Sequence, residues 1–560
     1  MLPEKEDGNI EYKLKMLNMS ESRIERLATQ MRYRCDEGGS ECIYNLGVED
    51  DGTITGITDD EYQTTIKCIA SAAYKNSYTI SKLTKTPVSP RGAGCDPVSP
   101  RGVGLDPVSP RGVGLEKNIY EVLIREKNEN SYIDVKVAIA GNVDAGKSTL
   151  LSVLINGKQD NGRGIARLAV FNFPHEVISG RTSSIGHQIL GYNYLGEVMN
   201  YHDNRCFTWP DIVKKSSKVI SFYDLAGHEK YLKTTIFGLS SSCPDMCFIM
   251  VGANRGVTKM TREHIFLCKT LEIPFCIVIT KIDMVKDCGN ILEETMHSII
   301  KILKNPGIRR IPIKVHTQDD IVRCAMNMHS KSIVPIFSVS NVTLEGISFI
   351  HKFLNITPKK PTIAGTKEVE CHLDTSWTVP GVGTVVGGHL ITGTIKIGDK
   401  LWFGPNANVY TQITVKSIHC KRVPVQFVGN SCYICIGVKG MVKTDLRKGN
   451  VLLSNKNQQI FCETIIADVE VLLSHSTTIR VGYHPMLHTQ NVRTSVMIEE
   501  INNKVSSRNA TTDTDLILRT GDTAQLTLRM CFDKCFVKVG ASILLCEGQT
   551  KVVGTIKSIN

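Results

Sequence analysis

The chain has 560 residues, room for about three or four domains, so a single small fold is excluded. Its 42% hydrophobic and 22% charged residues are ordinary globular usage, which excludes a chain that is disordered throughout. The 66 Lys and Arg exceed the 55 Asp and Glu by 11, a mild positive charge that suits an anionic partner but is far below that of a histone-like protein.

Three features of the sequence bear on location. We find no apolar run of about 18 residues, as a membrane helix needs. Residues 1–7 are acidic and polar, whereas a secretory signal is basic and then apolar. The 19 cysteines are odd in number and scattered, which favours reduced thiols over a disulfide framework. We expect a soluble cytoplasmic protein with no membrane contact.

Residues 1–86 predict a small α+β domain. Apolar residues have helical spacing over 21–33 and 59–74, and residues 42–48 have the pattern of a strand. After an insert, alternation within 117–130 predicts the last strand, which closes the sheet of this domain. Nothing in the domain suggests catalysis.

The insert at 87–116 consists of three similar ten-residue units, PVSPRGAGCD, PVSPRGVGLD and PVSPRGVGLE. Each unit has two prolines, two glycines and little apolar surface to offset the entropy of ordering, so we expect a disordered linker. The repeated serines, Ser89, Ser99 and Ser109, are compatible with a phosphorylation or docking tract and with a repeat that has no function.

The rest of the chain changes pattern twice. Residues 131–357 alternate apolar strands with helical segments, which predicts a doubly wound, mostly parallel α/β sheet. In 361–460 and 461–560, short alternating strands are separated by glycines. These segments predict two antiparallel β-barrels of about 100 residues each. The expected fold is therefore multidomain.

Residues Gly141–Ser148, GNVDAGKS, match the phosphate-loop pattern G-x-x-x-x-G-K-[ST] between an apolar strand and a helical segment. In such a loop backbone N–H groups wrap the β-phosphate, Lys147 neutralises β and γ oxygens, and Ser148 binds Mg²⁺. At the end of the next strand, Asp224 can reach Mg²⁺ through water and the Gly227 N–H can sense the γ-phosphate. The sequence predicts a nucleotide-operated switch.

The segment Thr280–Asp283, TKID, also ends a strand. The Asp283 carboxylate can accept from both N1–H and the N2 amino group of guanine, so we expect a guanine nucleotide, with the stem of Lys281 lying on the base. The backbone of Ser340–Val342 offers donors to the guanine carbonyl, although an ordinary β–α turn explains that stretch equally well.

The motifs GNVDAGKST, DLAGHEKYLKTT, TKID and VPGVGTVVGG resemble those of translational GTPases of the elongation factor Tu and eukaryotic elongation factor 1-alpha class. DNGRG at 160–164 and SGRTSSIG at 179–186 resemble, more narrowly, the GTP-binding protein 1 and 2 family. The similarity runs from about residue 20 to the end, apart from the insert.

The resemblance implies a P-loop GTPase domain followed by two barrels, with Mg²⁺ as cofactor and GTP or GDP as nucleotide. It also implies aminoacyl-tRNA and the ribosome as partners, with links to ribosome rescue and mRNA turnover. We expect a monomeric GTPase that delivers or holds aminoacyl-tRNA. The alternative is a GTP-regulated RNA-decay adaptor, in which hydrolysis times the release of partners.

Two positions depart from the family pattern. Thr280 stands where the guanine motif has asparagine, which is expected to weaken support of the base and loop. The first switch lacks the usual R-G-I-T-I. Counting back from the following glycine makes Thr182 the Mg²⁺ ligand and places Ile185 on the next strand, whereas alignment on the preceding arginine gives Ser184 that role.

His228 stands where the family has its catalytic histidine, and Val143 resembles one wing of the hydrophobic gate that holds this histidine. Asp144 is either a ligand for a monovalent cation or a plain turn residue. The candidate nucleotide-binding residues are Gly141, Asn142, Val143, Asp144, Ala145, Gly146, Lys147, Ser148, Thr149, Asp224, Gly227, Thr280, Lys281, Asp283, Ser340, Asn341 and Val342; the metal ligands are Ser148, Thr182 and Asp224; the catalytic residues are His228, Lys147 and Gly227.

Two groups in the barrels have competing interpretations. The pairs Cys432/Cys435 and Cys531/Cys535 have spacings that zinc sites use, but they lie in apolar strand-like sequence, which favours buried free thiols. The segment 475–490 resembles the family's tRNA-contacting segment. Its candidates for RNA contact, with simple packing or solvent exposure as the alternative, are His475, Arg480, Tyr483 and His488.

Overall fold

The computed structural model divides the chain into two compact units, residues 1–133 with 192–197, and residues 134–191 with 198–560. Residues 89–116 of the repeat lie outside the described part of the chain, so the disordered linker stays a prediction. The described residues are 4, 8–17, 19–88, 117–126, 132–171, 173–180, 182–202, 205–286, 290–360, 368–429, 432–472, 478–505, 517–547 and 549–560.

The first unit is a four-stranded sheet with two helices. Its strands lie in the order β1-β2-β4-β3; β1 is parallel to β2, and β4 is antiparallel to β2 and β3. Both predicted helices and the predicted strand β2 are present, whereas β1 and β3 were not predicted. The elements are β1 (Ile10–Lys13), α1 (Glu21–Glu37), β2 (Glu41–Leu46), α2 (Asp59–Lys75), β3 (Tyr78–Pro87) and β4 (Asn118–Glu126).

The strand after the insert, β4, lies inside this sheet and pairs on both sides. Pro87, at the end of β3, pairs with Asn118, at the start of β4. The repeat therefore connects the two strands of one hairpin. A long connection at such a place costs little, because the entropy of closing a loop grows only slowly with its length.

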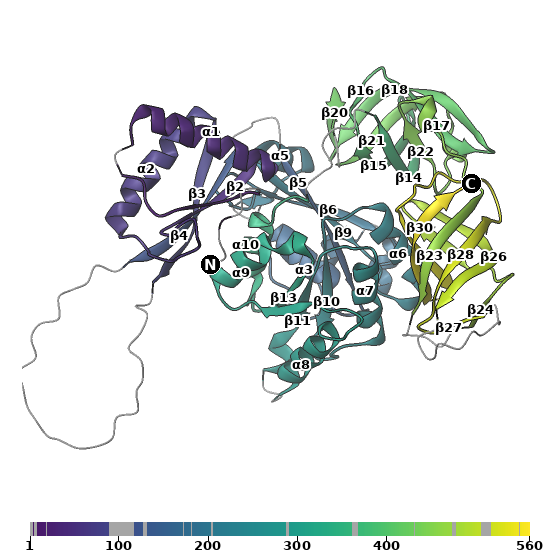
Figure 1. Ribbon diagram of the computed structural model, residues 1–560, viewed down its shortest axis with the longest axis horizontal. Coiled ribbons are helices and arrows are strands. Elements are labelled where there is room, and N and C mark those ends of the chain that lie inside the picture. Colours follow the sequence, from purple (N-terminus) through teal and green to yellow (C-terminus); the bar gives the residue numbers. More distant parts are fainter. Residues whose placement is uncertain are drawn as a thin grey trace, which may run out of the picture. The chain divides into compact units, whose positions relative to one another are not determined.

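The core of the first unit lies between the helices and the sheet, and Figure 1 shows α1 and α2 on the same face of the sheet. Leu27 and Met31 of α1 and Ile69 of α2 are buried there. The start of α2 is fixed by a capping box, in which the Thr58 hydroxyl accepts from the Glu61 N–H and the Glu61 carboxylate accepts from the Thr58 N–H.

The second unit begins with a seven-stranded sheet in the order β12-β13-β11-β10-β5-β9-β6. β10 is parallel to β5 and β11, and β13 is parallel to β11 and β12. The predicted alternation of apolar strands is present in β5, β9, β10, β11 and β13, and β12 was not predicted. Ile185 lies just before β6 rather than on it. The strands are β5 (Ile133–Gly141), β6 (Gly186–Tyr192), β9 (Lys218–Asp224), β10 (Met246–Gly252), β11 (Phe275–Thr280), β12 (Ile311–Lys314) and β13 (Ile333–Ser338).

Helices cover this sheet, whose strands β5, β9, β10 and β11 are buried along their whole length (Figure 1). Among the described residues, no helix is both long and apolar enough to cross a membrane. The helices and short segments are α3 (Lys147–Asn156), η1 (Ala166–Ala169), α4 (Pro174–Ser179), β7 (Tyr201–His202), β8 (Arg205–Cys206), α5 (Trp209–Lys215), η2 (Glu229–Tyr231), α6 (Leu232–Ser241), α7 (Lys259–Thr270), η3 (Ile282–Val285), α8 (Ile291–Leu303), α9 (Gln318–Met326), η4 (Met328–Ser330) and α10 (Ile347–Ile356).

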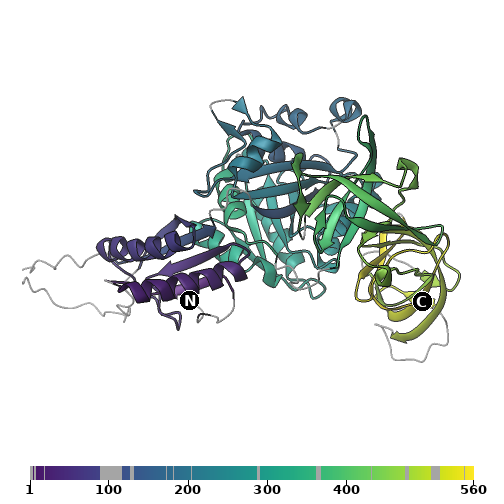
Figure 2. The ribbon, with the colours of Figure 1, turned by 90° about the horizontal axis from the view of Figure 1, so that it is seen from above.

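Two barrels follow. In the first, the ring β17-β22-β14-β15-β21-β18 closes through the β17–β18 pairing. The second is the closed ring β23-β28-β26-β25-β29-β30, coloured yellow and seen nearly end-on in Figure 2. The elements of the first barrel are β14 (Glu370–Val379), β15 (Gly383–Thr392), β16 (Ile395–Lys396), β17 (Lys400–Asn406), β18 (Val409–Cys420), β19 (Val423–Val425), β20 (Phe427–Val428), β21 (Cys432–Lys439), η5 (Lys443–Asp445) and β22 (Val451–Leu453). After η6 (Lys456–Gln458), those of the second are β23 (Thr464–Val471), β24 (Thr478–Arg480), β25 (Met486–Thr489), β26 (Val492–Val505), β27 (Ile517–Arg519), β28 (Thr523–Met530), β29 (Ser542–Glu547) and β30 (Gln549–Ile559).

Candidate nucleotide-binding site

The loop between β5 and α3 has a backbone that its glycines make possible. Gly141 and Gly146 have φ angles of 149° and 78°, and a Cβ added to Gly141 would lie 2.7 Å from the Met250 carbonyl oxygen. α3 begins directly after Gly146, so its first N–H groups open toward the loop. A helix N-terminus with such a loop is a site for phosphate.

Lys147 is buried at the mouth of this loop, 7% exposed. Its Nζ donates to the carbonyl oxygens of Gly141 and Asn142, at 3.2 and 3.0 Å. Burial lowers the pKa of Lys147, and the carboxylate of Asp224 opposes that shift. A Cβ added to Gly227 would lie 2.2 Å from this ammonium and 2.6 Å from the backbone carbonyl oxygen of Gly141, so the close approach of the second switch requires glycine there.

Ser148, Thr182 and Asp224 meet beside Lys147. The Ser148 Oγ donates to Asp224 Oδ2 at 2.6 Å and lies 2.9 Å from Thr182 Oγ1, which is 3.5 Å from the same carboxylate oxygen. Burial raises the pKa of Asp224, and within the described part of the chain its Oδ1 has no hydrogen-bond partner. Two hydroxyls and a carboxylate are hard oxygen donors, and they fit Mg²⁺.

The structure separates the two candidates for the first switch ligand. Thr182 reaches Ser148 and Asp224, as described above. Ser184 turns elsewhere: its Oγ and N–H both donate to Glu176 Oε1, at 3.0 and 3.2 Å. The carboxylate of Glu176, 1% exposed, binds Ser183 in the same way. Glu176 thus holds the Ser183–Ser184 hydroxyls away from Ser148 and Asp224.

His228 lines a cleft of about 420 Å³ together with Val143, Lys147 and Thr182. Its Nδ1 accepts from the Lys230 N–H at 3.1 Å. In a neutral ring an accepting Nδ1 leaves the proton on Nε2, so this ring nitrogen is a donor. The half-buried ring also packs on Tyr231, with centroids 6.1 Å apart.

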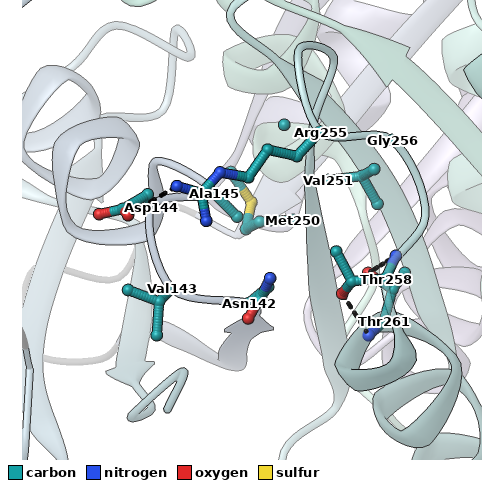
Figure 3. Close-up of a pocket in the computed structure, with 11 residues that line it drawn as sticks. Asn142, Val143, Asp144, Ala145, Met250, Val251, Arg255, Gly256, Thr258 and Thr261 are labelled. Carbon is teal, nitrogen blue, oxygen red and sulfur yellow. Dashed lines mark hydrogen bonds and ion pairs between the residues drawn. The ribbon is translucent and has the colours of Figure 1, made fainter.

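Asp144 has a partner that the sequence did not reveal. Its Oδ2 lies 3.4 Å from Arg255 Nη2, and both side chains are about half exposed (Figure 3). The same residue has φ 61°, a turn conformation. Neither interpretation of Asp144 from the sequence included this ion pair. Thr258 and Thr261 lie across the same small pocket and cap α7.

At the other end of the site, the sheet edge brings Asp283 and Ser340 together. Ser340 Oγ donates to Asp283 Oδ1 at 2.6 Å, and it also accepts from the N–H groups of Val342 and Thr343 at 3.2 and 3.1 Å. The serine therefore joins the two segments that the sequence assigns to guanine. Lys281, two residues before Asp283, has φ 62°.

Thr280, which replaces the usual asparagine, is fully buried. Its Oγ1 donates to the Ala145 carbonyl oxygen at 2.9 Å, so a short hydroxyl here still supports the phosphate loop. A Cβ added to Gly146 would lie 3.5 Å from Thr280 Oγ1 and 3.6 Å from Asn341 Nδ2. The Thr280 hydroxyl and the Asn341 amide thus lie directly behind the loop.

Sequence reasoning missed Asp160 and Arg167. The carboxylate of Asp160, 5% exposed, accepts from the N–H groups of Gly162, Gly164 and Ala166, each at 2.9 Å. Its own N–H donates to the Asn341 carbonyl at 2.9 Å. Arg167 follows and lines the cleft beside Lys147. The signal was available, because an aspartate before two glycines is typical of a side chain that organises a turn.

The candidates for RNA contact in the second barrel that the structure describes differ in exposure. His475 lies outside the described residues. Arg480 is exposed on β24, whereas Tyr483 is half-buried and donates to Glu547. His488 is 1% exposed, and burial lowers its pKa to about 4. Burial leaves the His488 ring no surface for RNA, so for this residue the structure favours packing, the alternative given above.

The four cysteines are free, but they are not all buried. Cys535 is buried, Cys432 and Cys435 are half-buried, and Cys531 is exposed with its Sγ 3.5 Å from His484 Nδ1. Among the residues that the structure describes, no group of three or more His, Cys, Asp or Glu is arranged to hold a metal. The expectation of burial is thus wrong for Cys531, which lies just beyond the end of β28.

Comparison with known proteins places this site in a family. Residues 134–376 match the elongation factor Tu GTP binding domain, and residues 383–453 match elongation factor Tu domain 2. GTP-binding protein 2 of Homo sapiens is 39% identical over 566 residues, which cover 100% of this chain and 88% of that protein. GTP-binding protein 1 of Xenopus laevis is 37% identical over 559 residues, covering 99% and 79%.

A solved structure agrees in fold. Translation elongation factor SelB from Methanococcus maripaludis, in complex with the GTP analogue GPPNHP, has a TM-score of 0.54 and 17% identity over 77% of this chain and 80% of that chain. The GTPase domain and the relatives establish that this protein binds and hydrolyses GTP. The chain belongs to the GTP-binding protein 1 and 2 family of translational GTPases.

Proposed function

We propose that this GTPase is a Mg²⁺-dependent switch that holds aminoacyl-tRNA in its GTP form and releases it when the ribosome stimulates hydrolysis. One observation carries the proposal: the segment that brings Thr182 to the candidate metal site continues directly into a contact with the first barrel. Five residues on, His187 packs on Tyr433 of β21, with ring centroids 5.0 Å apart.

In this mechanism the phosphate loop and Lys147 hold the β- and γ-phosphates. Ser148 and Thr182 would bind Mg²⁺ directly and Asp224 would do so through water; the ion would neutralise charge on the β- and γ-oxygens. Asp283 would bind the guanine edge. The Asp283–Ser340 hydrogen bond supports this role, because it fixes the carboxylate before the base arrives.

Hydrolysis would depend on His228. Because its Nδ1 accepts from the Lys230 N–H, the proton of the neutral ring is on Nε2. The Nε2–H would donate to the attacking water and orient it, rather than remove its proton. The Gly227 N–H would bind the γ-phosphate. Phosphoryl transfer needs positioning and charge stabilisation more than covalent help from the protein, which matches this set of groups.

Both switches continue into barrel contacts, which supports a conformational output. Beyond the first switch, His187 also packs on Tyr223 at 4.7 Å, and burial lowers its pKa to about 4, so the ring is neutral there. Beyond the second, Leu232 and Ile236 of α6 share a core with Val553 of β30. Loss of the γ-phosphate would therefore alter both barrel contacts.

The relatives support the choice of partner. A protein named elongation factor 1-alpha is similar to this chain in sequence, and one named elongation factor SelB is similar to it in fold. The test measures GTP hydrolysis with purified ribosomes, with and without aminoacyl-tRNA. Stimulation that requires both supports tRNA delivery. GTP-dependent RNA binding with no ribosomal stimulation would instead support the RNA-decay adaptor.

The metal ligands have a direct test. Thr182→Ala should raise the Mg²⁺ concentration that half-saturates GTP hydrolysis, and Ser184→Ala should leave it unchanged, because Ser184 binds Glu176. The reverse result would assign the switch ligand to Ser184.

A further inference from the structure

The candidate site contains a second cation whose role is unassigned. Arg167, on the short helix η1, lines the same cleft as Lys147, Thr182 and His228. It is half-buried, and no carboxylate in the described part of the chain forms an ion pair with it. An arginine that faces a phosphate cleft without a protein anion has its natural partner in an anionic ligand.

Two glycines make room for the guanidinium. A Cβ added to Gly180 would lie 2.7 Å from Arg167 Nη2, and one added to Gly164 would lie 3.0 Å from its Nε. Both glycines have positive φ, 64° and 81°. Larger residues on either side would displace the guanidinium, so the local sequence is suited to hold it at this place.

Asp160 fixes the backbone that carries Arg167. Its carboxylate accepts from Gly162, Gly164 and Ala166, which sets the turn immediately before Arg167. η1 in turn packs against α3, the helix that begins with Lys147. A buried carboxylate with three backbone donors makes a rigid support, so Arg167 is presented to the cleft by a fixed scaffold and not by a free loop.

The base end of the site shares this scaffold. The Asp160 N–H donates to the Asn341 carbonyl oxygen at 2.9 Å, and Gly162 lies against Val342, whose Cγ2 would be 3.9 Å from an added Cβ. Asp160 therefore connects the guanine loop to Arg167. A bound guanine that orders Ser340–Val342 would also steady the support of the arginine.

We propose that Arg167 is a catalytic arginine supplied by the chain itself, which binds the phosphates and stabilises the charge that develops during GTP hydrolysis. In that step the water oxygen bonds to the γ-phosphorus. The bond from this phosphorus to the β–γ bridging oxygen breaks, and its electron pair stays on that oxygen. The proton of the water ends on the released phosphate, and Arg167 keeps its own protons. The proposal rests on the nucleotide site proposed above.

The test is single-turnover hydrolysis by the full chain, beside titration with GTP and GDP. Arg167→Ala should lower the hydrolysis rate by about 10²-fold or more, which is the scale of losing one positioned group that stabilises charge in the transition state. GTP affinity should fall only a few-fold. Free guanidinium should restore part of the rate. Arg163→Ala, in the same loop but exposed, is the matched control and should hydrolyse GTP normally.

Failure of the role of Arg167 and failure of the nucleotide site would give different results. An unchanged rate in Arg167→Ala, or a loss that neither guanidinium nor Arg167→Lys restores even in part, would overturn the role of this arginine. Lys147→Ala tests the site itself: if it still binds GTP normally, the nucleotide site is misplaced, whatever Arg167 does.

A double-mutant cycle tests the scaffold. If Asp160 acts by seating Arg167, Asp160→Ala should slow hydrolysis, and adding it to Arg167→Ala should cause little further loss. Thermal unfolding of each variant shows that the protein is folded. Multiplicative losses would mean that Asp160 acts independently, and the seating of Arg167 would then be overturned.

Discussion

The two ends of the nucleotide site are built on different physical principles. At the phosphate end, Lys147 and Asp224 are both buried, and burial lowers the pKa of the lysine and raises that of the aspartate. At the base end, Asp283 is half-exposed and its carboxylate already accepts from Ser340. The phosphate end thus holds buried charges that a bound anion and cation would neutralise. At the base end, a hydrogen bond within the protein already fixes the carboxylate.

The difference predicts where each substitution acts. Buried charges interact strongly, so changes at the phosphate end should affect nucleotide binding or the chemical step by large factors. At the base end a lost hydrogen bond is partly replaced by water, so changes there should mainly alter which base is bound and how tightly.

Lys147→Ala should cause the largest effect. Removing the ammonium leaves the buried Asp224 and the phosphates without their counter-charge, so GTP and GDP affinity should fall by about 10³-fold, the scale of breaking a buried charge interaction. Equilibrium binding of a fluorescent guanine nucleotide measures this. Binding within a few-fold of the unaltered protein would contradict the placement of the phosphates.

His228→Ala should separate binding from chemistry. The side chain is expected to act on the water and not on the ground-state phosphates, so stimulated hydrolysis should fall by about 10²-fold while affinity changes only a few-fold. His228→Gln, which retains a donor, should recover part of the rate. If His228→Ala turns over normally in single-turnover assays, the histidine has no part in the mechanism.

Asp283→Asn should change base preference. The asparagine Oδ1 can still accept from Ser340, so the fold should be retained, but it offers an N–H₂ donor to the guanine donors. GTP affinity should fall by about 10- to 100-fold, since unpaired polar groups are costly, while xanthosine triphosphate should bind better. Competition between the two nucleotides is the measurement, and unchanged preference for GTP would refute the assignment.

Thr280→Val should have the smallest effect. The valine has nearly the shape of threonine but leaves the Ala145 carbonyl without its hydroxyl donor. We expect a loss of about 1–3 kcal/mol in the stability of the protein, and GTP affinity lower by roughly 5-fold. Thr280→Ser retains the hydroxyl and is the control. Equal melting temperatures for Val and Ser would show that this hydrogen bond contributes nothing.

Much of the nucleotide site is readable from the sequence. Gly141–Ser148, Asp224 and Asp283 each follow an apolar strand, and in a parallel sheet the carboxyl ends of the strands meet at one edge. Spacing and residue type are therefore sufficient to place these groups together. The helices of the first unit and the core strands of the large sheet were predictable for the same reason, since their apolar periodicity is local.

What the sequence left open depends on contacts between distant segments. Ser184 donates to Glu176, so Thr182 is the hydroxyl that reaches Asp224. The spacing of the motif gives no sign of the Glu176 carboxylate. Asp160 joins Asn341 across the chain and presents Arg167. β12 was missed because it is short and exposed, without the apolar signal of a buried strand.

By itself, then, the sequence determined the nucleotide class and the order of the domains, because loops with glycine and strands with buried faces are specified by neighbouring residues. Only the tertiary structure decided which hydroxyl of the first switch reaches Ser148 and Asp224, that His488 is buried, and that β3 and β4 form one hairpin around the repeat. Those outcomes depend on burial and hydrogen bonds between distant segments. The position of each side chain or strand is set by a partner far along the chain.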